Sequence, residues 1–252
     1  MIENPMILLP LLILFLPLLS FLVLIFFGKR LPRQGDWIAV GSILLTFFFA
    51  VYLFVQMLIN YNPDFSNSAS FSWIDLGAFK INLGILIDNL TIVMLLIVTL
   101  VSSCTHIFSL EYMKGDIRYN RYYAYLGLFT FSMNGIVLAD NLISMYMSWE
   151  LVGVSSYLLI GHWFEKDSAA NASKKAFLTN RVGDIGFFIG IMLLYSAVGA
   201  FAFSPIFDSI STGESIAGTT LTIAGLGIFM GAVGKSSQFP LHIWLPDAME
   251  GP

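Results

Sequence analysis

Ile223-Ala-Gly-Leu-Gly-Ile-Phe-Met-Gly-Ala-Val-Gly-Lys235-Ser-Ser-Gln-Phe-Pro240 is the stretch that decides the fold, because a lysine follows a long uncharged and mostly apolar run. Such a run is typical of a membrane helix. A charge at membrane depth costs roughly 2.5–3.5 kcal/mol on insertion scales, so Lys235 is expected to face a bundle interior or a water-filled cavity and to help move an ion or a proton. Glu150 lies in a second apolar run, residues 141–160. One acid and one base in separate apolar helices indicate function more than fold.

The composition excludes several classes of protein. The 252-residue chain is 57% hydrophobic and 11% charged, whereas soluble domains carry about 25% charged residues. The single cysteine, Cys104, excludes an internal disulfide and disfavours an iron–sulfur or structural zinc site. Gly234-Lys235-Ser236 resembles the end of a phosphate-binding loop, but Phe229 stands where that motif needs a glycine. We therefore expect an integral membrane protein with no metal and no nucleic-acid partner.

Hydrophobic segments give the predicted architecture. A spanning helix needs about 20 mainly apolar residues, and seven segments qualify. The prediction is an all-α membrane protein of about seven transmembrane helices with a short external β-hairpin in the loop of residues 61–84, where polar and apolar residues alternate. Pro240 and Pro246 interrupt the last segment, which predicts a discontinuous seventh helix. The segments are roughly residues 5–28, 36–60, 85–110, 122–139, 141–163, 174–201 and 217–249.

Lysine and arginine are distributed unevenly between the predicted loops. Nine of the twelve basic residues lie in the first, third and fifth loops, and only Lys80 lies in the even loops. Basic loops are usually cytoplasmic, so the N-terminus is predicted to lie outside. The two remaining basic residues, Arg181 and Lys235, lie inside predicted helices and therefore stand out from the loop charges.

The charged residues within the helices are the candidate site. If Glu150 and Lys235 face each other, each stabilises the charged form of the other, and separating them would release or bind a proton. That arrangement predicts a switchable proton relay, while the alternative is a static ion pair that fixes helix packing. Arg181 and Asp184 lie three residues apart on one helix face. They form either an intrahelical pair or groups that bias the charge of Lys235 or Glu150.

Other polar residues are weaker candidates. His242 follows the predicted break and is either a proton way-station or a packed polar residue. Asp88 and His106 lie near the two ends of the third predicted helix, which is more typical of interfacial residues. Small residues four apart predict close helix–helix packing, and they are Gly186 with Gly190 and Gly227 with Gly231.

Three stretches identify a family resemblance. Residues 147–161, 175–187 and 234–252 closely resemble the fifth, sixth and broken seventh helices of the L subunit (chain 5) of NADH-quinone oxidoreductase, respiratory complex I. The similarity covers essentially the whole chain. The large subunit of multisubunit sodium/proton antiporters shares the same core and is the nearest related family.

The resemblance implies a role for each candidate residue. Glu150 and Lys235 would belong to the first proton half-channel, and Asp184 and Arg181 would modulate them. No redox cofactor is implied for this chain, since flavin, iron–sulfur clusters and quinone are expected in other subunits. The implied partners are other membrane-arm subunits, especially the M-type antiporter-like subunit. The implied location is the bacterial plasma membrane or an equivalent energy-transducing membrane.

The resemblance also suggests how the chain is organised. Residues 1–120 would hold the first three helices with the external hairpin, and residues 121–252 would begin the antiporter-like proton-translocating repeat. Family members are more than twice this long, so we expect a chain truncated before the family's eighth helix. The leading hypothesis is a subunit that translocates protons, coupled to NADH oxidation and quinone reduction elsewhere. The alternatives are a cation/proton antiporter subunit and an inactive N-terminal fragment.

Overall fold

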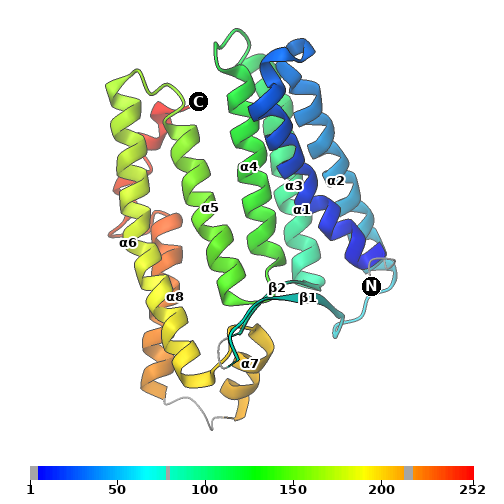
Figure 1. Cartoon of the computed structure of the whole chain (residues 1–252), viewed down its shortest axis with the longest axis vertical. Coiled ribbons are helices and arrows are strands. Elements are labelled where there is room, and N and C mark those ends of the chain that lie inside the picture. The colour runs from blue at the N-terminus through cyan, green and yellow to red at the C-terminus, as the bar shows by residue number, and fades with distance from the viewer. Residues whose placement is uncertain (1–4, 78–79, 213–217) are drawn as a thin grey trace. The chain divides into compact units, whose positions relative to one another are not determined.

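The computed structural model describes residues 5–77, 80–212 and 218–252, which are mostly helical (Figure 1). The chain forms two compact units, one of Met1–Ala69 with Gly84–Ala139 and one of Ser70–Leu83 with Asp140–Pro252. The prediction of a mainly helical fold is confirmed. Five helical segments of the described chain are long and apolar enough to cross a membrane, and they are Pro5–Arg30, Pro32–Ile59, Asn89–Tyr112, Leu142–Ile160 and Asp167–Val198.

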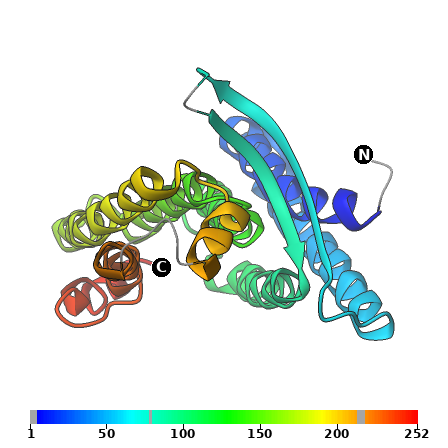
Figure 2. The same ribbon diagram turned by 90° about the horizontal axis from the view of Figure 1, so that it is seen from below.

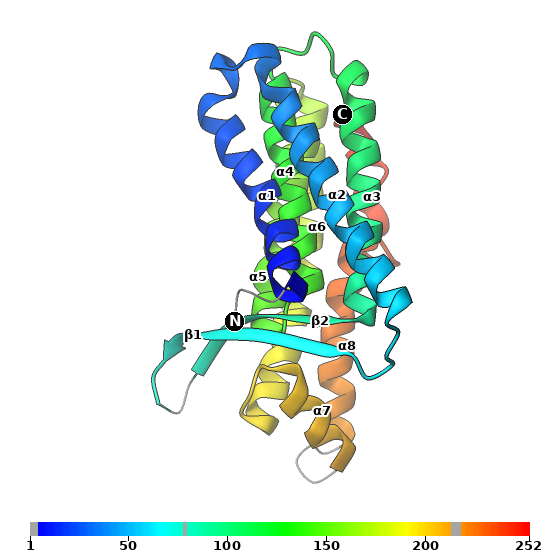
Figure 3. The ribbon, with the colours of Figure 1, turned by 90° about the vertical axis from the view of Figure 1, so that its right-hand side faces the viewer.

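The first unit is a bundle of four helices (Figure 3). Helix α1 packs against α2 and α4, and α2 packs against α3. Short 3-10 turns at Gly28–Arg30 and Pro32–Gly35 reverse the chain between α1 and α2. The side-chain amide of Asn134 donates to the carbonyl of Ile13 at 3.2 Å and ties α4 to α1. The helices are α1 (Pro5–Phe27), α2 (Asp36–Ile59), α3 (Asn89–Tyr112) and α4 (Tyr119–Leu138).

A two-stranded hairpin lies between α2 and α3 in the chain. Strands β1 (Ser66–Asp75) and β2 (Lys80–Asp88) pair along their length (Figure 2). The ammonium of Lys80 lies 3.0 Å from the carboxylate of Asp75, and this hydrogen bond lowers the pKa of the Asp75 carboxyl. Because β2 extends to Asp88, the third helix begins later than the predicted residue 85. The Asp88 side chain accepts the backbone N–H of Thr91 at 2.7 Å and so caps the start of α3.

The second unit holds four further helices and two short turns. The helices are α5 (Leu142–Ile160), α6 (Asp167–Val198), α7 (Phe203–Thr212) and α8 (Gly218–Lys235), followed by 3-10 turns η3 (His242–Trp244) and η4 (Asp247–Glu250). Helix α7 was not predicted from the sequence. It is short and amphipathic, and Ile206 on it joins the apolar core of this unit together with Phe187 and Ile191 of α6.

Glycines set the spacing between α6 and α8. A Cβ atom added to Gly190 would lie 2.6 Å from the carbonyl oxygen of Ala224. One added to Gly227 would lie 2.8 Å from the carbonyl oxygen of Gly186. One added to Gly231 would meet the Cβ of Phe187 at 2.9 Å. The predicted packing role of these glycines is confirmed, because the two backbones approach too closely for any side chain at these positions.

The seventh predicted helix, residues 217–249, is longer than the helix in the structure. Helix α8 ends at Lys235, before either proline. Ser237 adopts a left-handed conformation (φ 52°), and its N–H bonds to the carbonyl of Gly234 while the N–H of Gln238 bonds to that of Val233. This hydrogen-bond pattern is a Schellman motif, which closes a helix. The helix therefore stops through its own C-cap, and the prolines lie beyond it.

The α4 and α8 helices correspond to predicted spans 122–139 and 217–249 but are not among the five most apolar segments. Helix α4 begins with Tyr119-Asn-Arg-Tyr-Tyr, and α8 contains many glycines and threonines. These residues lower the hydropathy of both helices without changing their helical conformation.

The glycine contact predicts opposite effects for two similar substitutions. Gly190→Ala places a methyl against the α8 backbone and is expected to destabilise the protein by about 1–3 kcal/mol. Gly225→Ala is the matched control, since a Cβ at Gly225 meets nothing within 4 Å among the described residues. It should stabilise the α8 helix by roughly 0.5–1 kcal/mol. Thermal unfolding of the purified protein in detergent measures both, and equal shifts would contradict the packing argument.

Candidate functional site

Four of the five predicted site residues come together in the second unit. Glu150 lies on α5, Arg181 and Asp184 lie on α6, and Lys235 is the last residue of α8. The three helices are brought together mainly by the packing of α6 against both α5 and α8. The site is therefore a cluster of two acids and two bases between three helices.

The four charges form two ion pairs between helices. Arg181 on α6 pairs with Glu150 on α5. The Lys235 ammonium lies 3.5 Å from Asp184 Oδ2, which joins α8 to α6. Arg181 thus reaches across to α5 and does not pair with Asp184 on its own helix. The side chains are 36% (Arg181), 20% (Glu150), 14% (Lys235) and 2% (Asp184) exposed, so the Lys235–Asp184 pair is the more deeply buried one.

Trp149 is a member of the site that the sequence did not single out. Its indole N–H donates to Asp184 Oδ1 at 2.8 Å. The indole ring also packs edge-on against Phe187 of α6, with ring centroids 5.3 Å apart. The sequence signal that could have identified Trp149 is its position in the middle of a predicted span. Tryptophan is more common in the aromatic belts at the membrane interfaces. Asp184 thus receives both the Trp149 N–H and the Lys235 charge.

Several polar atoms at the site have no hydrogen-bond partner in the described part of the chain. They are Glu150 Oε1, Asn180 Oδ1 on α6, and Lys235 Nζ, and all are buried. Buried polar atoms are normally satisfied by protein or by internal water. Lys235 also stands at the C-terminus of α8, where the carbonyl ends of the helix favour a cation. The cluster is charge-balanced and retains donors and acceptors that can take further hydrogen bonds.

The position of Gly153 brings α5 close to the lysine. Gly153 is buried on α5, one turn after Glu150. A Cβ atom added to Gly153 would lie 2.6 Å from Lys235 Nζ. The ammonium therefore lies against the α5 backbone on the helix that carries Glu150. Gly153 has no partner glycine four residues away, so it lacks the spacing that predicts close helix packing, and its contact was not predicted.

His242 does not join the cluster. It lies in η3 beyond the end of α8, is exposed, and stacks on Phe239 with centroids 5.8 Å apart. The segment that carries it folds back on the second unit. The indole N–H of Trp244 donates to the carbonyl of Gly234 at 3.0 Å, and Lys175 pairs with Asp247 at 2.7 Å. The way-station role of His242 remains a prediction.

His106 belongs to the first unit and is fully buried. Its expected position near the membrane interface stays a prediction. Its Nδ1 lies 2.8 Å from the carbonyl oxygen of Ser102, and its ring lies beside Tyr123. The cause of this burial is the packing of α4 over this face of α3, where the Tyr123 hydroxyl donates to the His106 carbonyl at 3.0 Å. Within the described residues, no three His, Cys, Asp or Glu side chains converge as metal ligands would.

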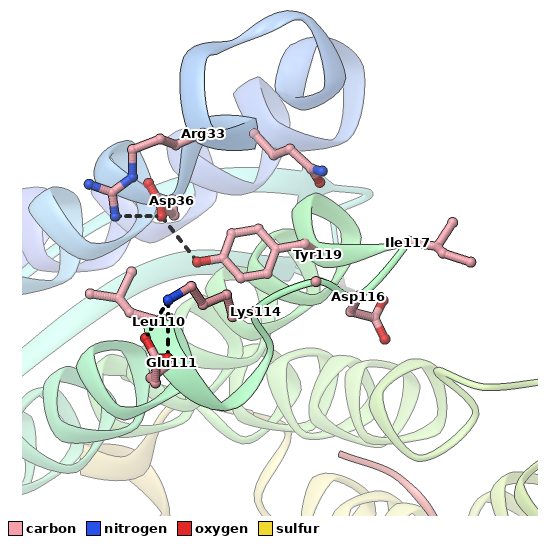
Figure 4. A pocket seen from close by; sticks show the side chains of 10 residues that line it. Arg33, Asp36, Leu110, Glu111, Lys114, Asp116, Ile117 and Tyr119 are labelled. Carbon is pink, nitrogen blue, oxygen red and sulfur yellow. Dashed lines mark hydrogen bonds and ion pairs between the residues drawn. The ribbon is translucent and has the colours of Figure 1, made fainter.

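A separate pocket of about 630 Å³ lies at one end of the first unit (Figure 4). Four of its five charged side chains form two ion pairs. Asp36 Oδ2 receives Arg33 at 2.9 Å and the Tyr119 hydroxyl at 3.0 Å, and Lys114 contacts Glu111 at 3.1 Å. These contacts lie at the starts of α2 and α4 and at the end of α3. The pocket is lined by Arg33, Gln34, Asp36, Leu110, Glu111, Lys114, Gly115, Asp116, Ile117 and Tyr119.

Two protein families match this chain. Residues 73–123 match the family described as NADH-Ubiquinone oxidoreductase (complex I), chain 5 N-terminus. Residues 139–252 match the family described as NADH:quinone oxidoreductase/Mrp antiporter, TM. All four charged residues of the cluster lie in the second of these matches. The resemblance predicted from the sequence is confirmed.

Curated relatives extend the match over most of the chain. Chloroplastic NAD(P)H-quinone oxidoreductase subunit 5 of Adiantum capillus-veneris is 43% identical over 233 residues, which cover 90% of this chain and 32% of the relative. The same subunit of Physcomitrium patens is 43% identical over 232 residues, covering 91% of this chain and 32% of the relative. The chain thus spans about a third of the length of these relatives.

Solved structures share the fold. A chain of the archaeal membrane-bound sulfane sulfur reductase superposes with a TM-score of 0.79 at 22% identity, covering 95% of this chain and 47% of that chain. A chain of the Mrp complex from Dietzia sp. superposes with a TM-score of 0.78 at 22% identity, covering 97% of this chain and 25% of that chain. At this identity the likeness describes the fold alone.

The contact of Trp149 with Asp184 gives a prediction for stability. Trp149→Phe keeps the aromatic ring and removes the N–H that the buried carboxylate accepts. Hydrogen bonds to charged groups contribute about 1.5–3 kcal/mol, so a loss of this size is expected. Trp37→Phe is the control, because Trp37 is an exposed residue of α2. Thermal unfolding in detergent compares the two, and the role of Trp149 is refuted if they shift the midpoint equally.

Proposed function

Because this chain belongs to the family of antiporter-like membrane subunits that includes chain 5 of complex I, we propose that it carries protons through the membrane arm of an NADH:quinone oxidoreductase. The chain itself would perform no redox chemistry. NADH oxidation and quinone reduction would take place in other subunits, and the chain would act as part of a translocase. The observation that carries the proposal is the cluster of two ion pairs on α5, α6 and α8.

The geometry supports a relay in which ion pairs exchange partners. Lys235 is held by Asp184, and Glu150 is held by Arg181. Each buried charge is stable only while its partner is near, because burial disfavours an isolated charge. If the Lys235 ammonium moves from Asp184 toward Glu150, both acids change partner. The proton on Lys235 can then pass to a neighbouring acceptor, and the lysine can be reprotonated from one side.

The remaining atoms of the site suit proton transfer. Glu150 Oε1 and Lys235 Nζ have no hydrogen-bond partner among the described residues, so each can take a hydrogen bond from or to water. Asp184 would act as a resting partner for Lys235, and Arg181 would hold Glu150 in an ion pair. We assign Glu150 and Lys235 to proton transfer, and Asp184 and Arg181 to modulation. His242 would serve as a way-station only if its segment moved toward the cluster.

The proposed setting follows from the helices. We propose that helices α1–α6 and α8 supply about seven membrane spans. The N-terminus and the short hairpin would lie outside. The partners would be other membrane-arm subunits, especially an M-type antiporter-like subunit. Flavin, iron–sulfur clusters and quinone would be bound by other subunits. The location would be an energy-transducing membrane.

Substituting either end of the relay tests this function. Glu150→Gln and Lys235→Met are made in the assembled complex, and NADH-driven proton uptake is followed in inverted membrane vesicles alongside NADH oxidation. Removing a group placed for proton transfer typically slows that step about a hundredfold or more. The number of protons moved per NADH is therefore expected to fall in both variants.

The control for this experiment is Lys114→Gln, since Lys114 forms an exposed pair with Glu111 outside the cluster. It should keep the wild-type proton yield. A wild-type yield in both Glu150→Gln and Lys235→Met would refute the relay. Proton movement that needs added sodium and no NADH would instead identify a cation/proton antiporter.

A further inference from the structure

Gly153 stands out because only the lysine of the site explains its lack of a side chain. A Cβ atom built on Gly153 would have one described atom within 4 Å, when the α5 backbone and the two chain neighbours are left out. That atom is Lys235 Nζ, at 2.6 Å. Gly183, Gly186 and Gly190 differ, because a Cβ atom built on each of them would lie within 3 Å of an α8 atom. That atom is a backbone atom for Gly183 and Gly190 and a side-chain atom for Gly186. Gly153 therefore does not serve helix packing as those glycines do.

The backbone at Gly153 also does not require glycine. The residue lies inside the continuous helix α5 and has no positive φ. Glycine in a helix interior is less favourable than alanine, because it loses more conformational freedom on folding. Neither the helix nor its packing accounts for the residue. The remaining explanation in the structure is the ammonium that rests against it.

The position of that ammonium matters for the relay. Lys235 Nζ lies 3.5 Å from Asp184 on α6 and against α5 one turn beyond Glu150. Ordinary contact with a methyl group begins at about 3.4 Å, so alanine at this position would push the ammonium away from α5 by about 1 Å. The far end of a lysine can move by this amount, so the fold would be kept while the charge is displaced.

We propose that Gly153 is a positioning residue of the relay. The space left by its missing side chain, which we call the seat, would hold the Lys235 ammonium against α5, the helix of Glu150, while it pairs with Asp184. The proposal rests on the proposed proton-transfer function. A shift of about 1 Å from a productive geometry can cost about a hundredfold in a transfer step. The glycine would thus leave the surface of α5 free of side-chain atoms at this point, so that the ammonium can move along the helix.

The functional test uses Gly153→Ala in the assembled complex. The number of protons moved per NADH is expected to fall to the level of Lys235→Met, while the amount of assembled complex on a native gel stays at the wild-type level. Gly225→Ala is the control, because a Cβ there meets nothing within 4 Å in the described chain, and it should keep the wild-type yield. A wild-type proton yield in Gly153→Ala would overturn the proposal.

A double-mutant cycle tests the seat without reference to proton transfer. Methionine at position 235 keeps the apolar stem and lacks an atom at the position of Nζ. Gly153→Ala is expected to lower the thermal unfolding midpoint of the complex when Lys235 is present. In the Lys235→Met background it should leave the midpoint unchanged or raise it, because the clash is gone and alanine favours the helix.

The two measurements separate the two ideas. Additive midpoint shifts in the cycle would overturn the seat whatever the proton yields are. Coupled shifts together with wild-type pumping in Lys235→Met would refute the proposed relay and leave the seat as a structural contact. Coupled shifts with pumping lost in both Lys235→Met and Gly153→Ala are the expected result.

Discussion

The close contact between α6 and α8 is the constraint on which the site depends. Gly190 and Gly227 let the two backbones approach within a distance that no side chain would allow. Because α8 ends at Lys235, this contact places the lysine beside Asp184 on the facing helix. The helix ends there through a C-cap built on Ser237, so the charge stands at the carbonyl end of the helix, where a cation is favoured. Helix packing and the placement of charge are thus set by the same residues.

The paired charges at the site contribute little to the stability of the fold. Desolvating two charges costs about as much as their attraction returns, so a buried pair adds little net stability, whereas removing one partner is costly. The arrangement of four charges on three helices therefore resists the loss of any member, and in the proposed relay the acids and bases would exchange partners. Asp184 is the fixed point, since it is the most buried of the four and is also held by the Trp149 N–H. In the proposed relay Lys235 would be the mobile member, because its long stem ends in an ammonium that rests against a glycine.

Local sequence signals predicted the helices well and their ends less well. The apolar runs predicted a mainly helical fold, and the glycines four apart predicted the close packing of α6 against α8. The start of α3 was misplaced because Asp88 acts as an N-cap at the end of a strand, and alternation and capping compete over the same few residues. The end of α8 was misplaced because a serine in a left-handed conformation closes it, and prolines are a more visible signal than such a cap. Helix α7 was missed because ten residues are too few to stand out by apolar content.

The sequence by itself determined that this is a helical membrane protein and that Glu150 and Lys235 are its unusual residues. Hydrophobic length and the cost of a charge in an apolar run are properties of neighbouring residues, so they can be read from the chain. Only the tertiary structure decided that Glu150 pairs with Arg181, that Lys235 pairs with Asp184, and that Gly153 lies under the ammonium. These contacts join residues far apart in the chain, and they depend on how closely and at what rotation three helices pack. Helical periodicity alone does not specify that geometry.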